Sequence, residues 1–296
     1  MIDLVRDLNN FDIQGFLPLL HNDSVIGYVN DQFKQLLNTR PFTITDEAVV
    51  YTHSNVEEDT MLIRKHFEML RDNAETPREI RNELRGWRNE EYGVYSLDNI
   101  LLFRLERAAA GILGIPTYGI HLTAYTDNYK IWIPRRSYNK QTYPGMLDNT
   151  VAGGIAFGDS VIHTVIKECE EEANLPADTI NNGIKSTGVV TYFYQKNNIF
   201  AQPEIQYIFD LQLPDDVIPK PNDGEVESFK LMDVAEIKDA LLSRQFKPNC
   251  ALVMIEFFMR HGIITPDIEE YVELSQSMHR QLPLSNIFTP NHRERS

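Results

Sequence analysis

The spacing of hydrophobic residues divides the chain into an N-terminal and a longer C-terminal unit. In residues 1–113, short apolar runs between turn residues predict strands, and apolar residues three or four positions apart predict helices. We therefore expect a small α+β domain here. Its expected elements are a helix at 2–8, hairpins at 16–29 and 42–51, and helical segments at 31–37, 57–70, 77–84 and 97–113.

The C-terminal unit, residues 114–296, follows the linker-like sequence Gly114-Ile115-Pro116. Alternating hydrophobic residues predict several strands, and these are interrupted and followed by amphipathic helices. The expected strands are 119–126, 130–134, 188–194, 204–211 and one that follows the turn 219–224. The expected late helices are 234–242, 248–260 and 267–278, and residues 290–296 should form a loose tail.

The centre of the chain, residues 153–175, predicts a glycine-rich loop that leads into a capped helix. The loop glycines permit positive φ and close approach of other groups, and Ser160 or Asp159 can cap the helix that follows. Asn174 lies just past the last periodic residue, where a left-handed residue often ends a helix. The sequence therefore predicts a rigid helix of about fourteen residues.

The last turn of this helix carries Glu168, Glu171 and Glu172. Because these positions are related as i, i+3 and i+4, the three carboxylates share one helical face. A divalent cation would offset their repulsion, since Mg²⁺ takes oxygen ligands from carboxylates, water and phosphates. The alternative interpretation is an acidic face in contact with solvent.

Composition restricts the partners of the chain. Its 296 residues carry a net charge of −15, which disfavours nucleic acid as a partner because phosphate backbones bind basic surfaces. No apolar run is long enough to span a membrane, and the first residues lack a secretory pattern, so we expect a cytosolic protein. Cys169 and Cys250 lie on apolar stripes of predicted helices and are expected to be core thiols.

Residues 135–140 form the densest basic stretch of this acidic chain. Arg135, Arg136 and Lys140 could clamp a diphosphate, because arginine donates two hydrogen bonds at once to phosphate oxygens, or they could belong to a solvated turn. Farther along, Glu225 and Glu227 alternate with Val226 on a predicted strand. Either glutamate could therefore reach the acidic helix, and Glu225 is preferred.

At the central stretch the chain resembles the Nudix hydrolase family. Set on Gly153, the family signature matches the opening glycine and Glu168, Glu171 and Glu172, while Asp159, Lys167 and Asn174 replace its Glu, Arg and Gly. The resemblance implies an α/β/α sandwich with a mixed sheet. It also implies that the three glutamates, with the carbonyl of Gly153, hold Mg²⁺ or alternatively Mn²⁺, and that Glu171 or Glu225 acts on the attacking water.

Beyond this signature, the chain resembles Nudix proteins related to thiamine pyrophosphokinase. The shared segments are 105–109, 119–121, 132–137, 144–149, 223–227 and 246–249, and they include Trp132 and Asp148 as candidate substrate-binding residues. The resemblance implies hydrolysis of thiamine diphosphate, or of oxythiamine or oxothiamine diphosphate, to the monophosphate. Alternatives are a Nudix hydrolase of ADP-ribose or NADH, and a non-catalytic diphosphate-binding module. The N-terminal unit could wall the pocket or pair chains into a homodimer.

Overall fold

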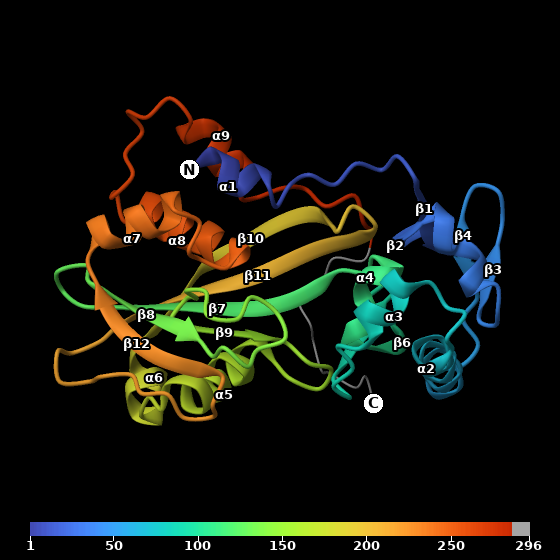
Figure 1. Ribbon diagram of the computed structural model, residues 1–296, viewed down its shortest axis with the longest axis horizontal. Coiled ribbons are helices and arrows are strands. Elements are labelled where there is room, and N and C mark those ends of the chain that lie inside the picture. The colour runs from blue at the N-terminus through green and yellow to red at the C-terminus, as the bar shows by residue number, and fades with distance from the viewer. Residues whose placement is uncertain (286–296) are drawn as a thin grey trace.

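The computed structural model describes residues 1–285, and the predicted tail at 290–296 lies outside this range. Figure 1 shows two units side by side, a smaller one that contains α2 and α3 and a larger one built around a long sheet. The larger unit is called the sandwich below. Within the described residues, no helix combines the length and the apolar character needed to cross a membrane.

The N-terminal unit contains a four-stranded sheet in the order β2-β1-β4-β3. Both predicted hairpins and the amphipathic helix at 57–70 are confirmed. The elements are β1 (Phe16–His21), β2 (Ser24–Asn30), β3 (Phe42–Ile44), β4 (Val49–Tyr51), α2 (Val56–Asp72) and α3 (Arg78–Leu84). A separate hairpin is formed by β5 (Glu91–Tyr95) and β6 (Leu101–Glu106).

Two helices expected in this unit take other forms. The segment 31–37 is a 3₁₀ helix, η1 (Asp31–Leu37). The segment expected as a helix at 97–113 begins instead with β6 and continues as η2 (Arg107–Ala109) and α4 (Ala110–Leu113). Leu102, Phe103 and Leu105 are all buried, so β6 is apolar on both faces. A short run of this kind cannot be told from a buried helix by periodicity alone.

The sandwich is built on a six-stranded sheet in which β10, β11, β7, β8 and β12 follow one another and β9 pairs with β7. Only the β7–β11 pairing is parallel among those of this sheet in the described chain, so the sheet is mixed, as expected. The strands are β7 (Thr117–Tyr125), β8 (Ile131–Arg136), β9 (Val151–Gly154), β10 (Ile184–Lys196), β11 (Phe200–Gln212) and β12 (Val226–Met232).

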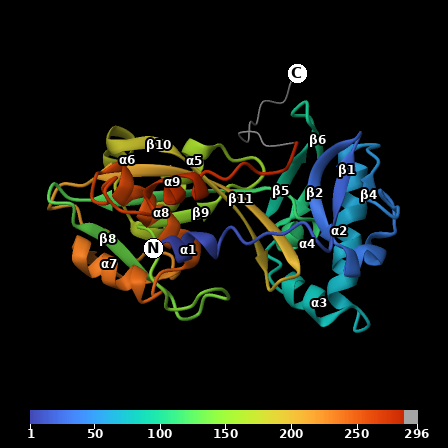
Figure 2. The ribbon, with the colours of Figure 1, turned by 90° about the horizontal axis from the view of Figure 1, so that it is seen from above.

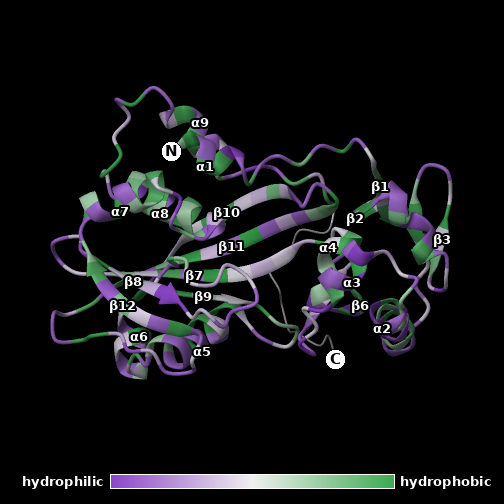
Figure 3. Cartoon of the chain, in the orientation of Figure 1, coloured by the Kyte–Doolittle hydropathy of each residue, from purple (hydrophilic) through white to green (hydrophobic). Residues whose placement is uncertain are grey.

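Helices cover both faces of this sheet, which confirms the predicted α/β/α arrangement (Figures 1 and 2). One face carries α5 (Val161–Ala173) and α6 (Ala177–Gly183), of which α6 was not predicted. The other carries α7 (Val234–Leu242), α8 (Pro248–Arg260) and α9 (Tyr271–Ser277). Figure 3 shows hydrophobic residues recurring along β7, β10 and β11, the strands between the two helical layers.

The first helix, α1 (Ile2–Arg6), packs on the sandwich. Ile2 and Val5 lie in the same apolar cluster as the buried side of α8, and Arg6 forms an ion pair with Glu273 at 2.7 Å. The chain then crosses to the N-terminal unit, passing Phe11, whose ring stacks on Phe193 with centroids 3.7 Å apart. The polypeptide therefore starts on the sandwich, builds the smaller unit and returns.

We expect Val5→Ala to lower the free energy of unfolding by about 2 kcal/mol, because Val5 is fully buried and the substitution leaves a cavity between α1 and α8. The matched control is Ile13→Ala in the same N-terminal segment, where the side chain is 55% exposed. Urea unfolding of both variants measures the difference. Equal stabilities for the two variants would contradict the packing of α1 on the sandwich.

Candidate active site

A cavity of about 880 Å³ lies where the two units meet. The N-terminal unit contributes one wall of the cavity through residues of α3, β5 and η2, as expected for one of its two predicted roles. The sandwich contributes β7, β9, α5, the β10–β11 hairpin, the loop at 140–143 and the start of α8. The charged side chains that line it are Glu83, Arg85, Arg88, Glu90, Arg107, Arg136, Lys140, Asp159, Lys167, Glu168, Glu171, Lys196, Glu204, Asp223, Glu225 and Lys247.

The glycine loop and α5 take the predicted conformation. The Ser160 hydroxyl accepts a hydrogen bond from the His163 N–H at 3.2 Å, and Asn174 ends the helix with φ of +49°. Val165 and Cys169 are fully buried against the sheet, which confirms the apolar stripe and the core position of Cys169. These features fix which helical face the glutamates present.

Gly153 lets the first glutamate approach the sheet. A Cβ atom at this position would lie 2.4 Å from Cδ of Glu168, so any larger residue would displace the carboxylate. Glu172 is 8% exposed, and its Oε2 accepts a hydrogen bond from the Ala152 N–H at 3.1 Å. Strand β9 therefore fixes two of the three glutamates from one side.

The third glutamate, Glu171, is exposed at the cavity, with an oxygen 3.9 Å from Nζ of Lys167. Glu168 also lines the cavity, whereas Glu172 lies beneath it. The loop acid Asp159 contacts Nδ1 of His163 at 3.1 Å. Of the glutamates in the acidic run, Glu172 is buried, Glu168 and Glu171 line the cavity, and Glu170 is exposed to solvent.

The electrostatics of these glutamates fit a divalent cation. Burial, and then the negative charges of Glu171 and Glu225, raise the pKa of Glu168 to about 7 even though Lys167 opposes them. Burial, followed by Asp148 and Glu168, also raises the pKa of Glu172. Carboxylate oxygens are hard donors, which are the ligands that Mg²⁺ and Mn²⁺ accept. The alternative interpretation, an acidic face in contact with solvent, applies to Glu170, which is exposed, but not to Glu172, which is buried.

The basic stretch divides between two sides of β8. Arg136 and Lys140 line the cavity, but Arg135 does not, because successive side chains of a strand point to opposite faces. Instead, Arg135 donates a hydrogen bond to the Gly145 carbonyl at 2.7 Å. Trp132, three residues earlier on the strand, packs against the core that contains α5. The assignment of Arg135 and Trp132 to the substrate-binding surface is therefore corrected.

Glu225 lies at the cavity and forms an ion pair with Lys140. Burial would raise the pKa of Glu225, but the hydrogen bond and charge of Lys140 outweigh it and leave the pKa lowered. Glu227 is exposed and does not line the cavity. The expectation that both glutamates point the same way is wrong, because the β8–β12 register shifts between Val226 and Ser228 and breaks the alternation.

Asp148 lies below the cavity in a buried network and does not line it, which corrects its assignment as a substrate-binding residue. Its carboxylate accepts hydrogen bonds from Arg136 at 2.6 Å and from the Cys250 thiol at 2.6 Å. Burial alone would raise its pKa, but Lys247, Arg136 and the thiol lower the pKa of Asp148 to about 2. The Asp148 carboxylate thus holds the Arg136 guanidinium in position from outside the cavity lining.

His121, Asp148 and Cys250 also bring their donor atoms within 4.8 Å of one another, a spacing that could hold a metal ion. The three side chains already have partners within the protein, since the Cys250 thiol donates to Oδ1 of Asp148 at 2.6 Å and Nδ1 of His121 lies 2.7 Å from Oδ1 of Asn149. Burial, followed by the charge of Asp148, raises the pKa of the Cys250 thiol. We therefore describe this cluster as a satisfied hydrogen-bond network, and Cys250 as the core thiol that the sequence predicts.

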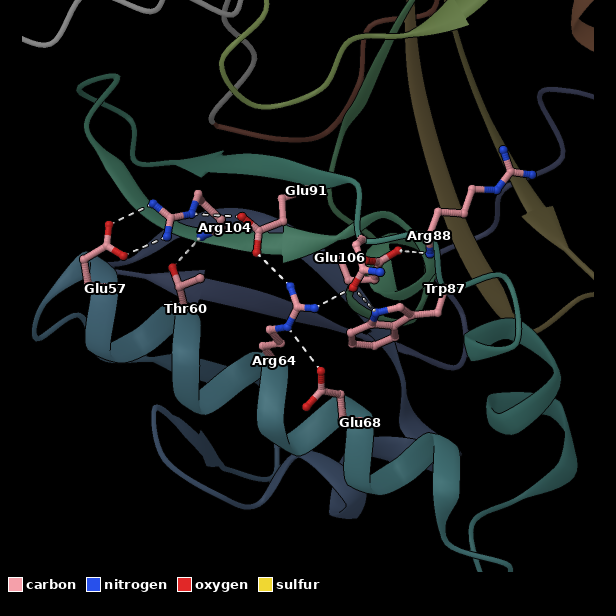
Figure 4. A network of polar contacts seen from close by, with 10 residues as sticks. Glu57, Thr60, Arg64, Glu68, Trp87, Arg88, Glu91, Arg104 and Glu106 are labelled. Atoms are coloured by element: carbon pink, nitrogen blue, oxygen red, sulfur yellow. Dashed lines mark hydrogen bonds and ion pairs between the residues drawn. The ribbon is translucent and has the colours of Figure 1, made fainter. Parts of the chain in front are cut away.

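A polar network holds the N-terminal wall in place. Figure 4 shows α2 facing β5 and β6, with Arg64 and Arg104 both reaching Glu91, at 3.4 and 3.0 Å. Trp87 lies beside this network, with the Arg64 guanidinium 5.6 Å from its ring centroid, so it is a packing residue. The Phe157 N–H donates to the Glu91 carbonyl at 2.7 Å, which ties the wall to the glycine loop.

Several cavity residues belong to no local spacing motif. Tyr92 and Arg107 come from the N-terminal unit, and Arg107 forms an ion pair with Glu90 at 2.9 Å. Glu204 and Lys247 come from β11 and the residue before α8. Arg107 and Lys247 lie in the shared segments 105–109 and 246–249, but only the packing of the two units shows that they reach one cavity.

Comparisons with known proteins agree with this geometry. Residues 117–250 match the NUDIX domain family, and residues 1–117 match a domain of unknown function, DUF4743. Nudix hydrolase 20, chloroplastic, of Arabidopsis thaliana is 36% identical over 281 residues, which are 89% of this chain and 72% of that protein. The uncharacterized protein YJR142W of Saccharomyces cerevisiae is 47% identical over 220 residues, and the match spans 69% of this chain and 64% of the yeast protein.

Among solved structures, DR0079 from Deinococcus radiodurans has a TM-score of 0.41 and 15% identity. That similarity covers 53% of this chain and 91% of that one.

We expect Asp148→Asn to lower the free energy of unfolding by about 3 kcal/mol at pH 7, because it leaves the buried Arg136 without its counter-charge. The folded pKa of about 2 lies below the model-compound value of 3.8, so the carboxylate stabilises the fold above about pH 4. The stability difference between wild type and variant should shrink as the pH falls from about 4 toward 2. Urea unfolding across this range, with the exposed Asp98→Asn as control, measures it. A difference that does not change with pH would contradict the assignment.

Proposed function

Because the chain belongs to the Nudix hydrolase family, whose glycine loop and glutamates it carries on β9 and α5, we propose that it hydrolyses a phosphoanhydride bond of a small-molecule diphosphate with the help of Mg²⁺. Mn²⁺ is the alternative ion. The cavity at the junction of the two units is the site of this reaction.

One observation carries this proposal, namely the crowding of Glu168 and Glu172 against β9. Both carboxylates are desolvated and surrounded by further negative charge, which raises the pKa of each. Such an arrangement is costly unless a cation accompanies it. Glu168, Glu171 and Glu172, with the Gly153 carbonyl, would hold the ion. A bound divalent ion supplies charge neutralisation at the phosphates and lowers the pKa of bound water.

The remaining side chains bind and orient the substrate. Lys140, Lys167 and Arg107 line the cavity and balance the negative charge of a diphosphate, while Arg136 is held in place by Asp148. Between the two candidate bases we favour Glu171. Lys140 lowers the pKa of Glu225 and so weakens it as a proton acceptor, whereas Glu171 is exposed at the cavity. Glu225 then serves to hold Lys140.

We propose thiamine diphosphate, or its oxidised analogues oxythiamine and oxothiamine diphosphate, as the substrate, with the monophosphate and phosphate as products. Support comes from the sequence segments shared with the Nudix proteins related to thiamine pyrophosphokinase and from the tyrosines that line the cavity. ADP-ribose and NADH are the alternative substrates. The non-catalytic alternative is disfavoured because the chain keeps all three glutamates. Cytosolic location and pairing into a homodimer stay predictions.

We expect Glu172→Gln to lower turnover about 100-fold or more, since it removes a carboxylate from the cation site. It should leave the fold intact, because the amide can still accept the Ala152 hydrogen bond and one buried negative charge is removed. Phosphate release and thermal unfolding together test this. Glu170→Gln, in the same acidic run but exposed, is the control. Turnover equal to that of the control would refute the assignment of Glu172.

A substrate screen tests the identity of the diphosphate. With Mg²⁺ present, we expect phosphate release from thiamine, oxythiamine and oxothiamine diphosphates to exceed the hydrolysis of ADP-ribose and NADH. Nucleotide products should be followed by chromatography in parallel with phosphate. Preferential cleavage of ADP-ribose or NADH would favour the alternative enzyme. Tight diphosphate binding without turnover would favour the binding module.

A further inference from the structure

Glu204 occupies the part of the cavity on the face of the sheet that carries α8. It lies on β11, opposite Tyr192 of β10 and Thr117 of β7. Its Oε2 accepts hydrogen bonds from Nε2 of Gln206 at 2.6 Å and from the Tyr192 hydroxyl at 3.4 Å. Among the described residues, no hydrogen bond ends on its other oxygen, Oε1. One carboxylate oxygen thus remains available to a bound molecule.

The position of the Glu204 carboxylate in the cavity carries a desolvation cost. Burial raises its pKa, and Lys247 and then Arg107 offset only part of that effect. Oε1 is not among the fully buried side-chain oxygens that lack a hydrogen bond in the described residues, and Glu204 is only partly buried, so this oxygen is open to the cavity. A bound molecule that donates a hydrogen bond to Oε1 would replace solvent there.

Aromatic side chains surround Glu204. Tyr143, Tyr192 and Tyr194 line the same cavity, and the rings of Tyr192 and Tyr194 lie 6.2 Å apart at an interplanar angle of 34°. The Tyr192 hydroxyl donates to Glu204 at 3.4 Å, and burial followed by the charge of Glu204 raises the pKa of both Tyr192 and Tyr194. Tyr143 is 41% exposed and can contact a planar ring, whereas Tyr192 is 1% exposed and packs beneath the cavity.

Two glycines lie near Glu204 at positions where an added side chain would clash with a neighbouring residue. A Cβ at Gly119 would lie 2.2 Å from Oε1 of Gln206, and one at Gly154 would lie 2.7 Å from the Tyr92 hydroxyl. Gly154 directly follows Gly153, against which Glu168 packs. Glu168, Glu171 and Glu204 all line the same cavity, so one molecule can contact both groups.

We propose that Glu204 is the specificity-determining residue for the ring of the substrate. Its Oε1 accepts a hydrogen bond from an N–H or amino group of a planar nitrogen heterocycle, which packs against Tyr143 and Tyr194. The diphosphate of the same molecule extends toward α5. This inference rests on the proposed function for the diphosphate, but it assigns a separate group to a separate part of the cavity.

The test compares diphosphates with and without a ring donor. For Glu204→Gln we expect KM for thiamine diphosphate and ADP to rise about 10- to 100-fold, with kcat changed less than about threefold, as for the loss of a hydrogen bond to a charged group. KM for isopentenyl diphosphate, which has no N–H, should stay unchanged. Glu79→Gln, which removes an exposed charge of α3 outside the cavity lining, is the matched control. Equal changes for all three diphosphates, or none, would overturn the inference.

A binding measurement separates this inference from the proposed reaction. Titration calorimetry with free thiamine and free adenosine needs no turnover, and the one that binds identifies the ring class. We expect Glu204→Gln to weaken that binding about 10-fold or more and Glu79→Gln to leave it unchanged. Loss of binding in a protein that hydrolyses no diphosphate would refute the reaction and keep the inference. Unaltered binding in Glu204→Gln would refute the inference alone.

Glu204→Asp provides a second variant in case the glutamine variant is unstable. It keeps the charge and withdraws the oxygen from the ring, so we expect it to fold and to weaken binding about 10-fold. Thermal unfolding verifies the fold of each variant. Wild-type affinity in a folded Glu204→Asp protein would count against recognition by Oε1.

Discussion

The repulsion among the carboxylates at the end of α5 is the constraint on which the site depends. Glu168 and Glu172 are held against β9 by the glycine at 153 and by the Ala152 N–H, and both lose solvent there. The caps at Ser160 and Asn174 fix the rotation of the helix, and the pairing of β9 with β7 fixes the strand beneath it. The surrounding fold therefore holds together charges that would otherwise separate.

The N-terminal unit contributes to the site and is more than an appendage. Its hairpin β5–β6 is tied to α2 by Arg64 and Arg104 through Glu91, and the Glu91 carbonyl also accepts the N–H of Phe157 in the glycine loop. Individual surface ion pairs stabilise little. The two that share Glu91 hold the hairpin on α2 and keep it rigid, and the Phe157 hydrogen bond joins that hairpin to the glycine loop before α5. The shape of the cavity therefore depends on both units.

The sequence was most informative where the chemistry is local. Helix α5 with both caps, the β10–β11 hairpin and the glutamates of the acidic run follow from spacing within a few residues. The helix expected at 97–113 failed because β6 is buried on both faces, which leaves no period to recognise. The shared segments 105–109 and 246–249 contain Arg107 and Lys247 but could not assign them to the cavity, and Glu204 carried no signal, because η2, β11 and the start of α8 meet only after the two units pack. The register shift in β12 likewise depends on its partner strand.

The packing of α1 on the sandwich has a consequence for how the protein can be divided. A fragment cut at Gly114 would follow the family boundary and still lose Ile2 and Val5 from the apolar surface of α8. Such an excised fragment would expose hydrophobic area to water and invite self-association. Because residues 11–113 lie between α1 and β7 in the chain while α1 packs on α8, the smaller unit is better regarded as an insertion than as a leading module.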